Sequence, residues 1–279
     1  MALALADARV RDACEAVVVG PRGAGLEPAE VVGEWRPGSG APAAGRCAGE
    51  AIERAVALAQ AGDVDGIVTA PLDKSALYGA GFDFPGHTEM LAALTGSRVA
   101  MMLASNRLRV VLATTHLALR DVPLALTREA IVQCAAVTRA GLREWFGIAE
   151  PRIALCALNP HAGDGGRFGR EDDELLAPAA RDAAIEGPFP ADTVFVRAMR
   201  GAFDAVIAPY HDVGMTAIKV ASFGSAVNVT LGLPFPRTSP DHGTALDIAG
   251  KGIADPSSFI EAVLLCSQIA SSRTRSTLS

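Results

Sequence analysis

The chain has 279 residues, enough for one large domain or two modest ones. Half of its residues are hydrophobic, 5% are aromatic, and the formal net charge is −6. The absence of a basic stripe argues against nucleic acid as a partner, and the longest apolar runs are shorter than the ~18 residues of a membrane span.

In the first part of the chain, helical and strand patterns alternate. The segment MALALADARVRD has no basic region and reaches Asp7 early, so it is not expected to be a signal peptide. The expected elements are, in order, the end of a helix at 4–15, a strand at 15–20, a Gly- and Pro-rich loop at 33–46, a helix at 49–60, a strand at 65–71 and a short helix opened by His87, Thr88 and Glu89.

The alternation continues to the C-terminus. The expected elements are strands at 98–104 and 109–115, a helix at 127–146, a strand at 152–158, a flexible glycine loop at 162–169, a helix at 171–186, a Pro-rich loop at 187–195 leading into a helix to about Arg200, a strand at 204–209, and a last helix at 256–270 before a frayed tail. This order predicts an α/β fold with a largely parallel sheet. The five cysteines are scattered without a CxxC pair, which is typical of free thiols in the cytoplasm.

Three of the five histidines directly follow predicted strands. They are His116, His161 and His211. The carboxyl ends of strands in an open α/β sheet face the ligand crevice, so three imidazoles there can converge on one divalent cation. Imidazole suits zinc and other first-row metals, although a single such histidine is more often a simple hydrogen-bonding residue.

Acidic and cationic residues accompany these histidines. Asp212 and Asp192 are candidates for orienting an imidazole or for accepting a proton, although Asp192 also fits a plain helix cap. Lys219, Asn228 and Arg237 form a candidate anion-binding group, since each charged hydrogen bond contributes on the order of 1.5–3 kcal/mol. His87 and Thr88 at a helix N-terminus are a second anion-binding candidate.

No dinucleotide fingerprint or Walker motif follows a predicted strand. The candidate nucleotide loop is instead SPDHGTALDIAGKG, residues 239–252, where small residues permit close backbone approach and Asp247 can accept a hydrogen bond.

Taken together, the motifs resemble the 4-hydroxythreonine-4-phosphate dehydrogenase family within the isocitrate and isopropylmalate dehydrogenase superfamily. The matching pieces, in family order, are TAPLDK, PGHTE, TTHLALRD, LNPHAGDGGRFG, GPFPADTVF, YHDVG, VNVTLGLPFPRTS and DHGTALDIAGKG. They cover about residues 49–260.

The resemblance implies a two-domain α/β fold with mostly parallel sheets and an active site in the interdomain cleft. One domain, 1–98 plus 229–279, is expected to bind NAD or NADP, and the other, 99–228, to bind metal and substrate and to form a homodimer. The metal, which is Zn, Mg, Mn or Co, is expected on His116, His161 and His211, with one of them supplied across the dimer interface. Substrate contacts are expected from His87, Thr88, Lys219, Asn228 and Arg237, and cofactor contacts from His242, Gly243, Thr244, Ala245, Asp247 and Asp255.

The implied reaction is oxidation and decarboxylation of a small phosphorylated hydroxy acid. The first candidate is the conversion of 4-phosphooxy-L-threonine to 3-amino-2-oxopropyl phosphate, a step of pyridoxal phosphate biosynthesis. The metal is expected to lower the pKa of the substrate hydroxyl and to stabilise the enolate left by decarboxylation. Asp212, Asp192 and Lys219 are the expected catalytic residues, the general base being one of the two carboxylates.

Two kinds of departure from the family pattern leave the substrate open. Val213 stands where Gln is usual, and Asp73 where His or Asn is common. The chain also starts at the helix that follows the family's first strand and GDPAGIGPE-like loop, which indicates a truncated gene model or a short variant. The alternatives are therefore a dehydrogenase of a phosphorylated four-carbon sugar acid or of a dihydrodiol carboxylate, a catalytically impaired metal-binding homologue, and a zinc hydrolase using the same histidines.

Overall fold

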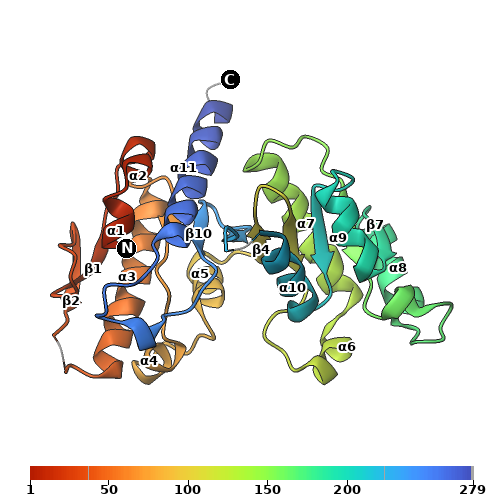
Figure 1. Ribbon diagram of the computed structural model, residues 1–279, viewed down its shortest axis with the longest axis horizontal. Coiled ribbons are helices and arrows are strands. Elements are labelled where there is room, and N and C mark those ends of the chain that lie inside the picture. The colour runs from red at the N-terminus through yellow and green to blue at the C-terminus, as the bar shows by residue number, and fades with distance from the viewer. Residues whose placement is uncertain (37, 223, 278–279) are drawn as a thin grey trace. The chain divides into compact units, whose positions relative to one another are not determined.

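A computed structural model describes residues 1–36, 38–222 and 224–277 of the chain. The chain divides into two compact units, residues 1–98 with 233–279, and residues 99–232. Figure 1 shows the elements of each unit. No helix within the described residues has the length and apolar character needed to cross a membrane.

Unit 1 is built from both ends of the chain. Its elements are α1 (Ala2–Leu5), α2 (Ala8–Ala13), β1 (Val19–Arg22), β2 (Glu30–Glu34), α3 (Ala41–Ala61), β3 (Ile67–Val68), α4 (Lys74–Gly79), α5 (His87–Thr95), β10 (Arg237–Pro240), the 3-10 turn η4 (Leu246–Ile248) and α11 (Ser257–Thr277). Strands β3 and β10 pair in parallel, as do β1 and β2. Helix α11 packs against α1, α2 and β10, and its Phe259 and Val263 form an apolar cluster with Ala4 and Val10.

Helix α3 begins at Ala41, so the loop predicted for residues 33–46 is wrong over its last six residues. Pro42 occupies the first turn, where the missing N–H costs nothing. Gly45 permits close approach to α4, because a Cβ there would lie 1.9 Å from the Ala76 carbonyl oxygen. The helix therefore needs the small residues that made this stretch resemble a loop.

Two segments near the chain ends, both in unit 1, also differ from the prediction. The predicted strand at 15–20 is displaced, since only Val19 and Gly20 of it belong to β1. The predicted frayed tail is helical as far as Thr277, the last residue of α11, and residues 278–279 lie outside the described chain.

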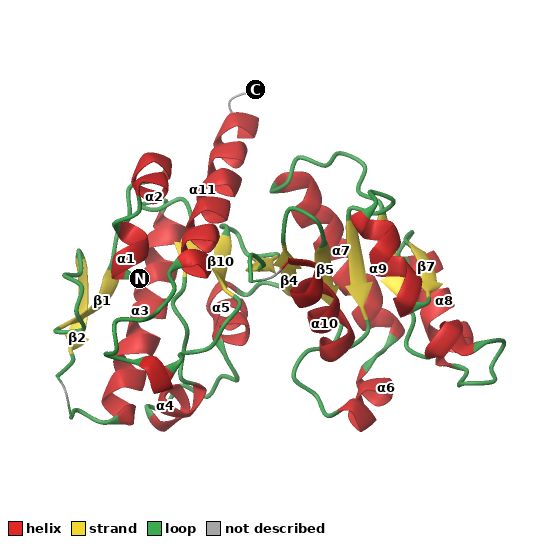
Figure 2. Cartoon of the chain, in the orientation of Figure 1, coloured by secondary structure: helices red, strands yellow, loops and turns green. Residues whose placement is uncertain are grey.

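Unit 2 contains a six-stranded run in the order β9-β4-β5-β8-β6-β7. Figure 2 labels β4, β5 and β7 of this run. Its elements are β4 (Ala100–Ala104), β5 (Arg109–Leu112), the 3-10 turn η1 (Leu119–Asp121), α6 (Val122–Ala125), α7 (Arg128–Glu144), β6 (Ile153–Cys156), the turn η2 (Pro160–Gly163), the π-helical turn η3 (Asp172–Leu176), α8 (Ala177–Asp182), β7 (Glu186–Phe189), α9 (Ala191–Met199), β8 (Ala205–Ala208), α10 (His211–Ser222) and β9 (Val227–Leu231). Strand β4 runs antiparallel to both neighbours, whereas the β5–β8, β8–β6 and β6–β7 pairs are parallel. The predicted α/β class is confirmed, and the sheet is mixed.

Helices cover both faces of the unit 2 sheet. Val110 and Leu112 of β5 share one buried cluster with residues of α9 and with Ile218 of α10. On the other face, α7 packs against β4, β5 and β9, and Gly141 lies against Leu231. Alternate residues of each strand thus enter opposite cores, as the period of two requires.

Three local predictions in unit 2 need correction. Helix α10 was not predicted, although Gly214, Ile218 and Ser222 recur at helical spacing on its buried face. The helix predicted at 171–186 ends at Asp182, and its first turn is π-helical. The Pro-rich loop predicted at 187–195 contributes strand β7, and its second half already lies in α9.

Candidate metal and substrate site

The three strand-end histidines follow three neighbouring parallel strands. His116 follows β5, His211 follows β8, and His161 follows β6, and β8 lies between the other two. The three strands therefore deliver their histidines to the same edge of the sheet, as their positions in the sequence indicated.

His116 and His211 lie together, with their ring centroids 5.6 Å apart and the ring planes inclined by 42°. Two imidazole nitrogens bound to one tetrahedral cation at about 2 Å place their ring centroids about 5 Å apart. The pair therefore has a separation suited to two ligands of one divalent cation. The donor type, an imidazole nitrogen, fits zinc and other late first-row metals better than it fits calcium.

Asp212 orients one member of this pair. Its Oδ1 atom lies 2.7 Å from Nδ1 of His211, which leaves Nε2 of that ring for a ligand. A carboxylate on the second ring nitrogen fixes the tautomer and raises the basicity of the other nitrogen. The Asp212 side chain is 84% exposed and that of His211 33%, so the pair lies at the accessible edge of the sheet.

Asp192 and Asp212 line one cavity of about 590 Å³ between α9 and α10. Its other lining residues are mostly apolar, among them Phe195, Met199 and Val220. Asp192 is an exposed residue of the first turn of α9, whose N-cap is Pro190, so the capping alternative for Asp192 does not describe its position. The structure thus places both candidate bases on one cavity.

His161 sits apart from the other two histidines within one chain. It lies on the turn η2 with φ of 54°, and its ring centroid is 6.4 Å from that of Phe168. Among the described residues of the single chain, no group of three His, Cys, Asp or Glu side chains lies close enough to hold a metal ion.

The predicted anion group divides between the two units. Lys219 is exposed on α10, eight residues after His211, which corresponds to about 12 Å along a helix axis. Asn228 lies in β9, and its buried side-chain oxygen has no hydrogen-bond partner within the described structure. Such an orphaned acceptor is costly unless a ligand or water satisfies it.

Arg237 belongs to unit 1 and is only 2% exposed. Its guanidinium donates a hydrogen bond of 2.5 Å to the Thr69 hydroxyl, and burial lowers its pKa to about 10. A buried guanidinium is expensive to maintain without an anion nearby. The negative charge of Glu89 offsets part of this cost, because it favours the protonated form of Arg237.

His87, at the start of α5, shares this environment. Burial, followed by the positive charges of Arg237 and Lys74, lowers the pKa of its imidazole to about 3. The ring is therefore neutral at pH 7, and the local field favours an anion. Lys74 was not among the predicted site residues, although TAPLDK ends on it directly after strand β3.

The predicted cofactor residues form an exposed loop in unit 1. His242, Gly243, Thr244, Ala245 and Asp247 are all exposed, and η4 lies within the same loop. Asp255 has a structural task, because its carboxylate accepts hydrogen bonds from the backbone N–H and hydroxyl of Ser257 at the start of α11. These two bonds lower the pKa of Asp255.

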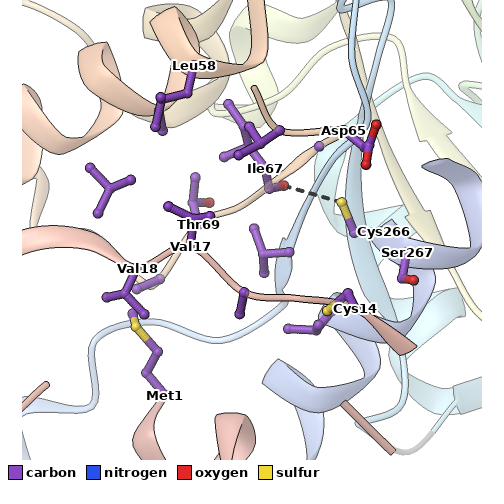
Figure 3. A pocket seen from close by; sticks show the side chains of 18 of the residues that line it. Met1, Cys14, Val17, Val18, Leu58, Asp65, Ile67, Thr69, Cys266 and Ser267 are labelled. Atoms are coloured by element: carbon purple, nitrogen blue, oxygen red, sulfur yellow. Dashed lines mark hydrogen bonds between the residues drawn. The ribbon is translucent and has the colours of Figure 1, made fainter. Parts of the chain in front are cut away.

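A cavity of about 730 Å³ lies elsewhere in unit 1, between α3, β3 and α11 (Figure 3). Its lining includes Leu58, Ile67 and Cys266, together with Val17 and Val18. Burial raises the pKa of the Cys266 thiol to about 11, which keeps it protonated and unreactive. Among the predicted site residues His87 lines this cavity, as does Thr69, the hydrogen-bond partner of Arg237, so the cavity reaches the surroundings of that guanidinium.

The model of the family described as pyridoxal phosphate biosynthetic protein PdxA matches residues 6–266. The chain belongs to the PdxA family. It is 52% identical over 234 residues to the 4-hydroxythreonine-4-phosphate dehydrogenase of Caulobacter vibrioides, covering 80% of this chain and 70% of that protein. A Bradyrhizobium diazoefficiens relative, named provisionally as a D-threonate 4-phosphate dehydrogenase, is 49% identical over 252 residues, or 84% of this chain and 73% of the relative.

The fold agrees with solved structures of PdxA proteins. The crystal structure of 4-hydroxythreonine-4-phosphate dehydrogenase from Klebsiella pneumoniae superposes with a TM-score of 0.78 at 41% identity, covering 91% of this chain and 82% of that one. The resemblance found in the sequence is confirmed.

Proposed function

We propose that this PdxA protein is a dehydrogenase that uses NAD or NADP and a divalent metal to oxidise and decarboxylate 4-phosphooxy-L-threonine to 3-amino-2-oxopropyl phosphate, in pyridoxal phosphate biosynthesis. The observation that carries the proposal is the family match over residues 6–266, within which the strand-end histidines lie. We place the protein in the cytoplasm, as a member of a biosynthetic enzyme family.

The metal would be held by the imidazoles of His116, His211 and His161. When bound, a divalent cation there supplies Lewis-acid chemistry that lowers the pKa of the substrate hydroxyl and stabilises the charge left by decarboxylation. Asp212 orients His211 through the 2.7 Å contact to Nδ1. Asp192, on the same cavity, is then the better placed of the two carboxylates to receive the hydroxyl proton.

Five polar side chains would bind the substrate. Arg237 supplies a fixed guanidinium, and neutral His87 and Thr88 supply hydrogen bonds at the N-terminus of α5. In unit 2, the orphaned oxygen of Asn228 and the ammonium of Lys219 complete the proposed set.

We assign NAD to the loop at residues 242–255, in the unit formed by both chain ends. Leu246 and Ile253 are 66% and 67% exposed there, which is unusual for aliphatic side chains on a polar loop. Such side chains can pack on the face of an adenine ring, while Asp247 accepts a hydrogen bond.

We also propose a homodimer formed through unit 2. Val220 is 70% exposed and Met199 36% exposed on the apolar groove between α9 and α10. A second copy that covers this groove would remove that surface from water, and His161 of the partner subunit would complete the pair formed by His116 and His211. Light scattering of the purified protein tests the dimer, and a monomer at micromolar concentration would contradict it.

The test of the reaction is direct. The full chain is supplied with NAD, a divalent metal and 4-phosphooxy-L-threonine, and NADH formation is followed at 340 nm. Metal removal by a chelator is expected to abolish the signal and metal return to restore it. Asp192→Asn is expected to lower kcat with metal content unchanged, whereas Asp212→Asn lowers metal affinity.

A second substrate, D-threonate 4-phosphate or a similar phosphorylated four-carbon acid, is supported by two observations. A 49% identical relative carries that name, and Val213 replaces the usual Gln next to Asp212. NADH formation with that acid alone would select this alternative. Metal binding without activity on either acid would identify a catalytically impaired homologue.

A further inference from the structure

The glycine-rich segment after β6 is a tightly held turn. His161, Ala162 and Asp164 all have left-handed backbone conformations, with φ of 54°, 54° and 47°. Non-glycine residues adopt this region rarely, and three of four consecutive residues do so here. The flexible loop predicted for residues 162–169 therefore has a defined conformation that some other group must maintain.

Asp172 holds the backbone immediately ahead of this turn. Its side chain is fully buried, at 0% exposure, in the first position of η3. One carboxylate oxygen accepts from the backbone N–H of Leu158 at 2.8 Å, and the other accepts from the N–H of Asn159 at 3.0 Å. Both N–H groups lie just before Pro160 and His161, so the carboxylate sets the direction in which the chain leaves β6.

Glu171 holds the same turn from its other side. Its Oε2 atom accepts a hydrogen bond of 2.8 Å from the side-chain amide of Asn159. Gly169 closes the arrangement, because a Cβ there would lie 2.4 Å from that Glu171 oxygen and 2.7 Å from the Asn159 amide nitrogen. The acidic residues and the glycines of the motif thus act together on one piece of backbone.

We infer that Asp172 is a positioning residue for His161, and that it presents this imidazole for metal binding by clamping the two N–H groups ahead of it. The inference rests on the proposed function, in which His161 supplies one metal ligand. Asp172 itself touches neither metal nor substrate. The buried position of the carboxylate explains the geometry, since two backbone donors satisfy its charge only while the turn keeps its present shape.

Asp172→Asn is the sharpest variant because it keeps the shape of the side chain. The amide retains one acceptor oxygen and turns an N–H donor toward the other backbone N–H. The matched control is Asp173→Asn, which removes the same charge from the neighbouring exposed residue. Glu171→Gln is a milder variant, because it weakens the bond to Asn159 and leaves the buried carboxylate in place.

The experiment titrates Co²⁺ into the metal-free full-length protein and follows calorimetric heat and the visible Co²⁺ spectrum, which responds to ligand number. Asp172→Asn is expected to weaken Co²⁺ affinity by about 10–100-fold, as loss of a ligand-orienting group commonly does, and Glu171→Gln by less. Asp173→Asn should bind Co²⁺ with the affinity of the wild type. The double variant His161→Ala with Asp172→Asn should bind Co²⁺ no more weakly than His161→Ala alone, because the Asp172 carboxylate acts through the His161 ring.

The outcomes separate the two levels of the proposal. If the wild type binds no Co²⁺, or His161→Ala leaves its affinity unchanged, the proposed metal site is wrong and the positioning role falls with it. If His161→Ala weakens binding while Asp172→Asn only lowers the melting temperature, the positioning role alone is wrong. Should Asp172→Asn not fold, an unchanged affinity in Glu171→Gln would overturn the inference, and an intermediate affinity would support it.

Discussion

The Thr114 hydroxyl donates a hydrogen bond of 2.7 Å to the Pro209 carbonyl, and both groups are buried. Thr114 lies two residues before His116, and Pro209 two residues before His211. The contact therefore ties the ends of β5 and β8 together immediately ahead of the two imidazoles. It extends the hydrogen-bond ladder between β5 and β8, in which the N–H of Ala113 donates to the Ala208 carbonyl at 2.9 Å.

Replacing Thr114 with Val should test this tie, because Val has the same shape without the hydroxyl. The Pro209 carbonyl then loses its donor, and the free energy of unfolding is expected to fall by about 1–3 kcal/mol in urea denaturation. Metal affinity should fall as well, as the two rings are no longer held at 5.6 Å. Thr115→Val is the control, and equal effects of the two variants would contradict the role assigned to Thr114.

Gly214 allows α10 to lie directly on the sheet. A Cβ at this position would be 2.7 Å from a methyl group of Leu112 and 3.0 Å from the Ala208 Cβ. Gly214→Ala is therefore expected to destabilise the protein by about 1–3 kcal/mol through overpacking. It should also displace His211, three residues earlier on the same helix.

The control for that variant is Gly79→Ala, since a Cβ on Gly79 would meet nothing within 4 Å. That helical exchange should be neutral or stabilising by roughly 0.5–1 kcal/mol. Thermal unfolding of both variants supplies the measurement, and a neutral Gly214→Ala would show that α10 can move away from β5 without cost.

The depressed pKa of His87 has a consequence for acid stability. The imidazole titrates near 6.5 in the unfolded chain and at about 3 in the folded one. Between these values the unfolded state binds the extra proton, so stability rises with pH across this window and is lost as the pH falls.

His87→Gln removes this titration. The unfolding free energy of the variant is expected to depend less steeply on pH between 6.5 and about 3 than that of the wild type. Urea titrations at a series of pH values give the two slopes. Parallel slopes would show that His87 titrates normally in the folded protein.

Arg237 is expected to contribute through geometry as well as charge. Arg237→Lys keeps the positive charge and loses the fork that reaches the Thr69 hydroxyl. The KM for the phosphorylated substrate should rise by roughly 10–100-fold, corresponding to about 1.5–3 kcal/mol for one charged hydrogen bond. Arg36→Lys, at a side chain 81% exposed, is the control, and a similar KM for both variants would remove Arg237 from the substrate site.

Much of the candidate site was visible in the sequence because it depends on where strands end. His116, His161 and His211 were placed at strand ends by local apolar patterns, and the structure puts their strands side by side. The supporting groups were not visible in this way. Thr114 and Asp172 act on backbone atoms brought to them by folding, and no local pattern marks such a contact.

The errors in the predicted secondary structure have a similar origin. Helix α10 begins inside a motif rich in functional residues, and α3 contains glycines that local propensity assigns to a loop. In both helices the small residues face a neighbouring element at close range. Tertiary packing therefore outweighs the local preference.

By itself, the sequence determined the α/β class, the family, and the residue types available for chemistry, because periodicity and ordered motifs are properties of the linear chain. Only the tertiary structure decided that His116 and His211 lie together while His161 stays apart, and that Arg237 is buried beside neutral His87. The reason is physical: distances, desolvation and the pKa of a side chain depend on neighbours that lie far away along the sequence.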